Sequence, residues 1–130
     1  MNPLHDTIVS LSTALAIQAV SIIRLSGDRA LEITEQLLKK PLSNQDHRLT
    51  YGFVHEAEQI VDEVIVLVMK APRSYTREDV VEIQCHGGIY VTQKILSLVL
   101  GLGARLANNG EFTQRAVMNG RIDVSQAEAV

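Results

Sequence analysis

One stretch of this sequence concentrates side chains that could do chemistry. RSYTREDVVEIQCHGG, at residues 73–88, holds two arginines, three carboxylates, one histidine, a glycine pair and the only cysteine of the chain. Such a set is compatible with a metal site, with a cysteine nucleophile, or with a site that only holds a ligand. The spacing of the residues distinguishes these alternatives.

Alternating residue types at Val80–Cys85 indicate a strand and argue against a metal or a nucleophile. Successive side chains of a strand point to opposite faces, which separates Cys85 from Glu82. No second cluster of histidine or cysteine follows to complete a set of metal ligands. Cys85 and His86 are neighbours that point apart, so they do not form a nucleophile and its base. We expect no catalytic residue and no metal ligand here, and we interpret Cys85 as a small buried hydrophobe.

Glu82 and Arg24 are charged residues within two apolar runs. Glu82 interrupts a Val/Ile-rich strand, and Arg24 lies near the end of the predicted strand Ala19–Leu25. Either each lies on a solvated face, or both strands open onto one cleft whose polar groups in apolar surroundings would suit a small molecule. A carboxylate there fits a ligand edge with two adjacent N–H donors, as on a guanidine-like heterocycle.

Other glycines and arginines leave alternatives open. Gly87-Gly88 makes a plain turn or lets a ligand approach the backbone. Arg115 and Arg121 flank the turn signal Asn119-Gly120, and either they lie in a solvated loop or Arg121 reaches an anionic part of a ligand or partner subunit. Gly101-Leu-Gly103 follows a predicted helix and is read as its C-cap, and the sequence contains no P-loop.

The composition is that of a soluble globular domain. The chain has 130 residues, 46% of them hydrophobic, and a net charge of −3, so it has no basic surplus for RNA binding by this segment alone. A single cysteine fits a reducing compartment. We find no apolar run of roughly 18 residues and no secretory signal, and we expect a cytoplasmic protein without membrane contact.

The hydrophobic periodicity predicts an α+β domain with a mostly antiparallel sheet and helices packed on one face. Strands are expected at 6–11, 19–25, 49–54, 63–69, 80–85 and 104–106, and helices at 28–40, 89–103 and 111–118. In the second helix, Val91, Ile95, Leu98 and Leu102 are expected to share a face. A further helix starts at Asp123, where Ser125 and Glu128 have capping-box spacing. Because it starts so near the end of the sequence, we expect the chain to be a fragment.

Three blocks of the sequence together resemble the N-terminal domain of the bacterial tRNA-modification GTPases of the MnmE or TrmE family. The blocks lie at 6–27, 62–88 and 103–130, and they include APRSYT, EDVVEI, CHGG and GEFT in the family's order. The resemblance implies a tetrahydrofolate-binding and dimerisation domain at 1–122 and the start of a helical domain at 123–130.

The resemblance also implies what the whole protein does. It would hydrolyse GTP with Mg²⁺ and K⁺ in a domain absent from this sequence, and modify C5 of the wobble uridine of tRNA together with an FAD-dependent partner. The cofactor of this domain would be 5-formyl- or methylene-tetrahydrofolate, in a homodimer. This segment alone is not expected to be catalytic.

Three positions match the family's folate contacts, namely Arg24, Glu82 and Arg121. The family usually has lysine at the last position, which keeps the charge but not the geometry. Residues 13–21 lack the family's Pro- and Gly-rich loop, and Asn109 replaces a usual proline. The altered loop leaves a second hypothesis open, a structural dimerisation domain whose folate pocket has degenerated. A stand-alone one-carbon transferase is the weakest alternative, since no nucleophile or general base is positioned.

Overall fold

The computed structural model describes residues 6–13 and 19–130, which form a six-stranded sheet and four helices. The strands are β1 (Ile8–Leu11), β2 (Val20–Ser26), β3 (Leu49–Glu56), β4 (Gln59–Met69), β5 (Val80–His86) and β6 (Arg105–Leu106). The helices are α1 (Ala30–Leu38), α2 (Ile89–Gly101), α3 (Glu111–Met118) and α4 (Val124–Glu128). The predicted α+β class and order of elements are confirmed.

The sheet is mixed, whereas a mostly antiparallel sheet was predicted: the pairings other than that of β1 with β6 are antiparallel. Its order is β3-β4-β5-β2-β1-β6, and β6 pairs with β1 in parallel. The N–H groups of Arg105 and Ala107 donate to the carbonyls of Thr7 and Val9 at 2.9 Å each. Alternation reveals that a segment is a strand but not its direction, which depends on how the preceding connection returns the chain to the sheet.

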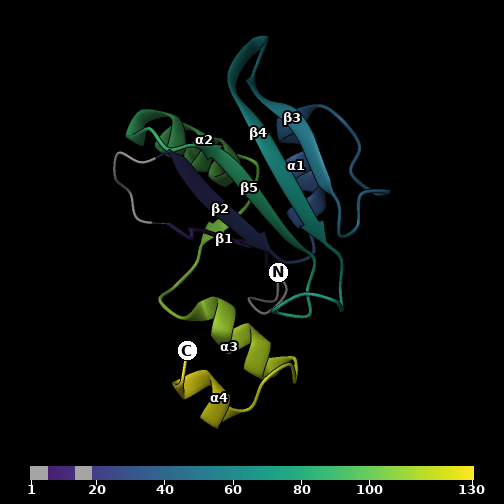
Figure 1. Ribbon diagram of the computed structural model, residues 1–130, viewed down its shortest axis with the longest axis vertical. Helices are drawn as coiled ribbons and strands as arrows, with labels where there is room; N and C mark the ends of the chain where they lie inside the picture. The colour runs from purple at the N-terminus through teal and green to yellow at the C-terminus, as the bar shows by residue number, and fades with distance from the viewer. Residues whose placement is uncertain (1–5, 14–18) are drawn as a thin grey trace.

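Helices α1 and α2 cover one face of the sheet and lie behind it in Figure 1. The core between these layers contains Ile23, Val66 and Ile83, all fully buried. Cys85 lies in the same core, as alternation predicted. The core-facing side of α1 consists of its buried residues Ala30, Ile33, Thr34, Leu37 and Leu38.

The inward face of α2 is rotated by about one residue from the predicted one. Thr92, Ile95 and Val99 are its buried residues, whereas Val91, Leu98 and Leu102 are partly buried at the margin of the core. The reason is a polar contact inside the core, where the Thr92 hydroxyl donates to Ser21 Oγ at 3.0 Å. A satisfied hydroxyl can occupy a position that periodicity assigns to an apolar side chain.

Helices α3 and α4 lie beyond one end of the sheet and do not share the layer of α1 and α2 (Figure 1). The prediction of helices on one face therefore holds only for α1 and α2. The capping box of α4 is also formed by other residues than predicted: Asp123 is the N-cap and Gln126 the reciprocal partner, because Ser125 is already inside the helix. No helix among the described residues is long and apolar enough to cross a membrane.

Candidate ligand-binding site on the open face of the sheet

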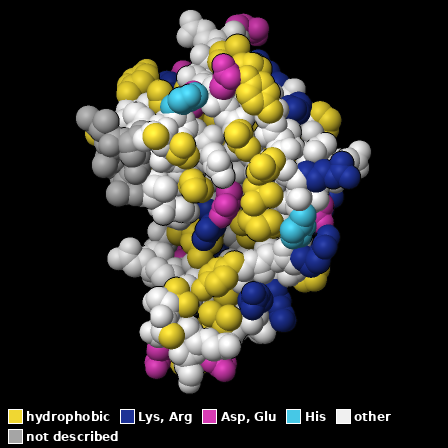
Figure 2. Space-filling view, in the orientation of Figure 1, with side chains coloured by type: hydrophobic (Ala, Val, Ile, Leu, Met, Phe, Trp, Pro, Cys, Tyr) yellow, Lys and Arg dark blue, Asp and Glu magenta, His cyan; other side chains and the backbone are white. Residues whose placement is uncertain are grey.

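In the part of the chain that the structure describes, α1 and α2 pack on one face of the sheet, and the opposite face carries exposed apolar side chains. Val20 of β2, Tyr51 of β3 and Ile65 of β4 are 48%, 55% and 41% exposed. Figure 2 shows hydrophobic side chains gathered over this side of the molecule, with charged groups among them. This open face is where strand alternation places Arg24 and Glu82.

Arg24 and Glu82 form an ion pair within the open face. They are directly opposite each other in the antiparallel pairing of β2 with β5. Arg24 Nη2 and Nε lie 2.6 and 2.8 Å from the same oxygen, Glu82 Oε2. Their side chains are 34% and 16% exposed. Of the two alternatives that the sequence left open, the structure thus shows the one in which these strands bring both charges together.

The two carboxylate oxygens of Glu82 differ in the hydrogen bonds that they accept. In the described part of the chain, Oε1 accepts no hydrogen bond from the protein, while both contacts of Arg24 go to Oε2. An ionised carboxylate has about four lone-pair sites over its two oxygens. Glu82 is thus held in place through one oxygen and retains acceptor capacity at the other.

Phe112, at the start of α3, adds an aromatic ring to this pair. The Arg24 guanidinium carbon lies 5.8 Å from the centroid of the Phe112 ring, within the range of a cation–π contact. The sequence contains only two phenylalanines, and nothing in the local pattern around 112 indicated which residue its ring would meet.

Arg121 lies past the other end of α3. The helix ends in a Schellman motif, in which Gly120 takes a φ of 76° and donates to Val117 O, while the Arg121 N–H donates to Ala116 O. The predicted turn at Asn119-Gly120 is thus explained. The Arg121 side chain is exposed, and no contact within the described residues joins it to Arg24 or Glu82.

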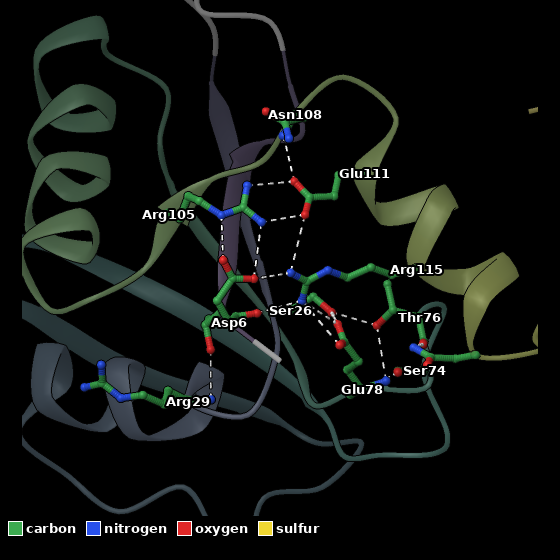
Figure 3. Close-up of polar contacts among 12 residues, drawn as sticks. Asp6, Ser26, Arg29, Ser74, Thr76, Glu78, Arg105, Asn108, Glu111 and Arg115 are labelled. Carbon is green, nitrogen blue, oxygen red and sulfur yellow. Dashed lines mark hydrogen bonds and ion pairs between the residues drawn. The ribbon is translucent and has the colours of Figure 1, made fainter. Parts of the chain in front are cut away.

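A partly buried group of charges joins α3 to the sheet, and Figure 3 shows how its members face one another. We call it the anchor cluster, and it consists of Asp6, Glu78, Arg105, Glu111 and Arg115. Arg105 Nη2 and Arg115 Nη2 lie 2.6 and 3.4 Å from Glu111 Oε2, and each arginine also contacts Asp6. Arg115 Nη1 lies 3.1 Å from Glu78 Oε1, which also accepts from the Ser26 hydroxyl.

The anchor cluster perturbs its own carboxylates. Hydrogen bonds from Arg105 hold the pKa of Asp6 and of Glu111 below their ordinary values, against the opposing effect of burial. The hydrogen bond to Glu111 in turn raises the pKa of Arg105. Lowered carboxylate pKa values and a raised arginine pKa are typical of a structural ion network, in which contacts between the groups stabilise their charged forms.

From the sequence, Arg115 was assigned only to a solvated loop beside Arg121. The structure instead buries Arg115, which is only 3% exposed. The sequence offered one indication that Arg115 pairs with a carboxylate. Glu111 and Arg115 are i and i+4 on one helix and therefore share a face. Nothing in the sequence indicated that Asp6 would be their long-range partner.

Cys85 and His86, at the end of β5, point apart as predicted: Cys85 is buried and His86 is exposed. Burial raises the pKa of Cys85 to about 11, and its thiol donates to Ser21 O at 3.5 Å. His86 Nδ1 lies 2.6 Å from Asp62 Oδ1. Within residues 6–13 and 19–130, no group of three or more histidine, cysteine or acidic side chains is arranged to hold a metal ion.

Next to that end of β5 lies a shallow hollow of about 260 Å³, lined by Val20, Tyr51, Ile65, Gln84 and His86 among others. Gly88 caps α2 with an ordinary φ of −67°, and a Cβ added there would meet nothing within 4 Å. The backbone therefore does not require glycine at this position. Most of the altered loop at 13–21, namely residues 14–18, lies outside the described residues.

The fold and its open face are those of a small α+β domain that presents charged groups and apolar side chains on one uncovered sheet face. Residues 7–121 match the family described as GTP-binding protein TrmE N-terminus. The chain belongs to this family, as its sequence motifs indicated.

Full-length relatives carry the same segment. The chain is 52% identical to the tRNA modification GTPase MnmE of Lachnoclostridium phytofermentans and 56% identical to that of Thermoanaerobacter pseudethanolicus, over 96% of its own length. The MnmE of Lactococcus lactis subsp. cremoris is 55% identical over the same share. The chain spans 28–29% of the length of these relatives.

Proposed function

We propose that this chain is the tetrahydrofolate-binding and homodimerisation module of a tRNA modification GTPase. Its family membership and its relatives, each named tRNA modification GTPase MnmE, support this function. In the whole protein, a GTPase domain would bind GTP with Mg²⁺ and K⁺. With an FAD-dependent partner and in the cytoplasm, that protein would modify C5 of the wobble uridine of tRNA.

The observation that carries the folate proposal is how the two oxygens of Glu82 are used. Arg24 occupies Oε2, so Oε1 is the acceptor for a ligand. The pterin ring of a folate presents adjacent N–H donors of the kind that a carboxylate accepts. Burial on an apolar sheet face strengthens such a charge-assisted hydrogen bond relative to the same bond in water. Glu82 would therefore hold the pterin of 5-formyl- or methylene-tetrahydrofolate.

We assign Arg24 and Arg121 to opposite ends of the folate. Arg24 is already committed to Glu82 and would support the pterin end. Arg121 follows the opposite end of α3, and from Phe112 to Met118 the helix rises about 9 Å. A folate is an elongated ligand with carboxylates at its tail, and Arg121 is the cation we assign to that tail.

The apolar part of the open face supports the homodimer. Monomeric proteins rarely leave large contiguous apolar patches in water, and Val20, Tyr51 and Ile65 all lie exposed on this face. A second copy of the chain would cover them. The net charge of −3 leaves tRNA contacts to other parts of the complex.

Titration calorimetry with 5-formyltetrahydrofolate, combined with sedimentation analysis of the same sample, tests both parts. We expect binding to a dimer. A folded dimer that gives no heat at millimolar ligand would exclude the folate and leave the structural dimerisation domain, which the altered 13–21 segment favours. A folded monomer would contradict the homodimer.

A further inference from the structure

Among the contacts of Arg24 with described residues, that with Phe112 comes from outside the sheet. Arg24 meets Glu82 across two strands and meets the Phe112 ring from α3. The Arg24 side chain is 34% exposed, and a long arginine side chain at such exposure ordinarily samples several rotamers. An aromatic face within reach of the guanidinium restricts that sampling.

The segment of α3 that carries Phe112 is itself held in place. Phe112's neighbour Glu111 belongs to the anchor cluster, and its neighbour Thr113 shares a hydrogen bond of 3.0 Å with the Tyr75 hydroxyl. Three residues further along, Arg115 ties α3 to Asp6 and Glu78. Helix α3 is therefore fixed on both sides of Phe112, and the ring is presented to Arg24 before any ligand arrives.

We infer that Phe112 is a positioning residue of the Glu82 site. Its ring keeps the Arg24 guanidinium on Glu82 Oε2 and so leaves Oε1 available to the ligand. Without the ring, Arg24 would be able to turn to both oxygens of Glu82 as a fork, since a guanidinium and a carboxylate pair most readily through two parallel hydrogen bonds. Ligand donors would then compete with Arg24. This inference rests on the proposed function for the identity of the ligand.

The test replaces Phe112 by leucine, which keeps apolar bulk but removes the aromatic face, and by tyrosine, which keeps the face. Phe53 is the only other phenylalanine of the sequence, and Phe53→Leu is the matched control. The readouts are 5-formyltetrahydrofolate affinity by calorimetry and the Nε–H signal of Arg24 in ¹H–¹⁵N spectra, assigned by its loss in Arg24→Lys.

We expect Phe112→Leu to weaken folate binding about fivefold, within the range of a cation–π contact, and to shift or broaden the Arg24 signal. Phe112→Tyr should restore both, and Phe53→Leu should change neither. In a Glu82→Ala background, Phe112→Leu should have no further effect on affinity, because the two residues act through one site.

Unchanged Arg24 signal and affinity in Phe112→Leu would overturn the inference, as would an equal loss in Phe53→Leu or full additivity with Glu82→Ala. If the unmodified chain binds no folate, the proposed function fails, and the Arg24 signal then decides the positioning role alone. A signal altered in Phe112→Leu but not in Phe53→Leu supports that role, and an unaltered one overturns it.

Discussion

The molecule contains two groups of charges that differ in how completely they are satisfied. In the anchor cluster, Asp6 and Glu111 each accept from both Arg105 and Arg115, and Glu78 accepts from Arg115 and from Ser26. On the open face, Glu82 accepts from Arg24 through one oxygen and from no other residue in the ranges 6–13 and 19–130.

This difference separates a structural role from a binding role. A buried carboxylate that is surrounded by fixed donors has no acceptor capacity left for a ligand and contributes by joining elements. A carboxylate that one partner orients, and that keeps an oxygen unpaired, is prepared for donors that arrive from outside. Helix α3 contacts both groups, through Glu111 and Arg115 in the anchor cluster and through Phe112 at Arg24, so the anchor cluster also supports the site by fixing this helix.

Removing Arg115 should have the largest effect on stability. Arg115→Met keeps the length of the side chain but leaves Asp6, Glu78 and Glu111 with Arg105 as their only remaining cation in the anchor cluster. Breaking a buried ion network from one side costs about 3–5 kcal/mol. We expect a loss of this size in the free energy of unfolding, measured in urea.

Arg73→Met is the control for that variant, because Arg73 pairs with Asp46 while its own side chain is 71% exposed. Its effect should be far smaller, as exposed ion pairs contribute little. Similar losses in the two variants would show that the anchor cluster does not carry the structural role that its contacts indicate.

Acid should weaken the same cluster. The ordinary pKa values of Asp6 and Glu111 are 3.8 and 4.5, and the folded values are lower. Such groups contribute their full stability above the unfolded pKa and lose it as the pH falls through the folded pKa. We expect the free energy of unfolding to fall from about pH 5 downward. In Glu111→Gln the fall should be shallower, and an equal slope would contradict the assignment.

Removing Glu82 should affect binding and leave stability nearly unchanged. Glu82→Ala is expected to weaken 5-formyltetrahydrofolate binding at least tenfold, about 1.4 kcal/mol, while the dimer stays intact. Arg24 is partly exposed and can be hydrated once its partner is gone. Glu63→Ala, which removes an exposed carboxylate from the same sheet face, is the matched control. Unchanged affinity in Glu82→Ala would remove Glu82 from the site.

The candidate site was partly predictable from the sequence. Arg24 and Glu82 stood out because a charge inside an apolar strand needs either water or a partner, and that conflict is visible locally. Arg115 and Phe112 were missed in their roles because both lie on a short helix of ordinary composition. The residues near them in the chain do not indicate that Arg115 contacts Asp6, 109 residues away, or that Phe112 contacts Arg24.

The sequence by itself determined the kinds of element and their order. It also placed Cys85 in the core and Glu82 outside it, because backbone geometry imposes a period of two on strands and 3.6 on helices. Only the tertiary structure decided the direction of β6, the rotation of α2 and the partners of each charge. Those depend on strand register and on which elements the chain brings together: Arg24 reaches Glu82 across 58 residues because β2 and β5 are neighbours in the sheet.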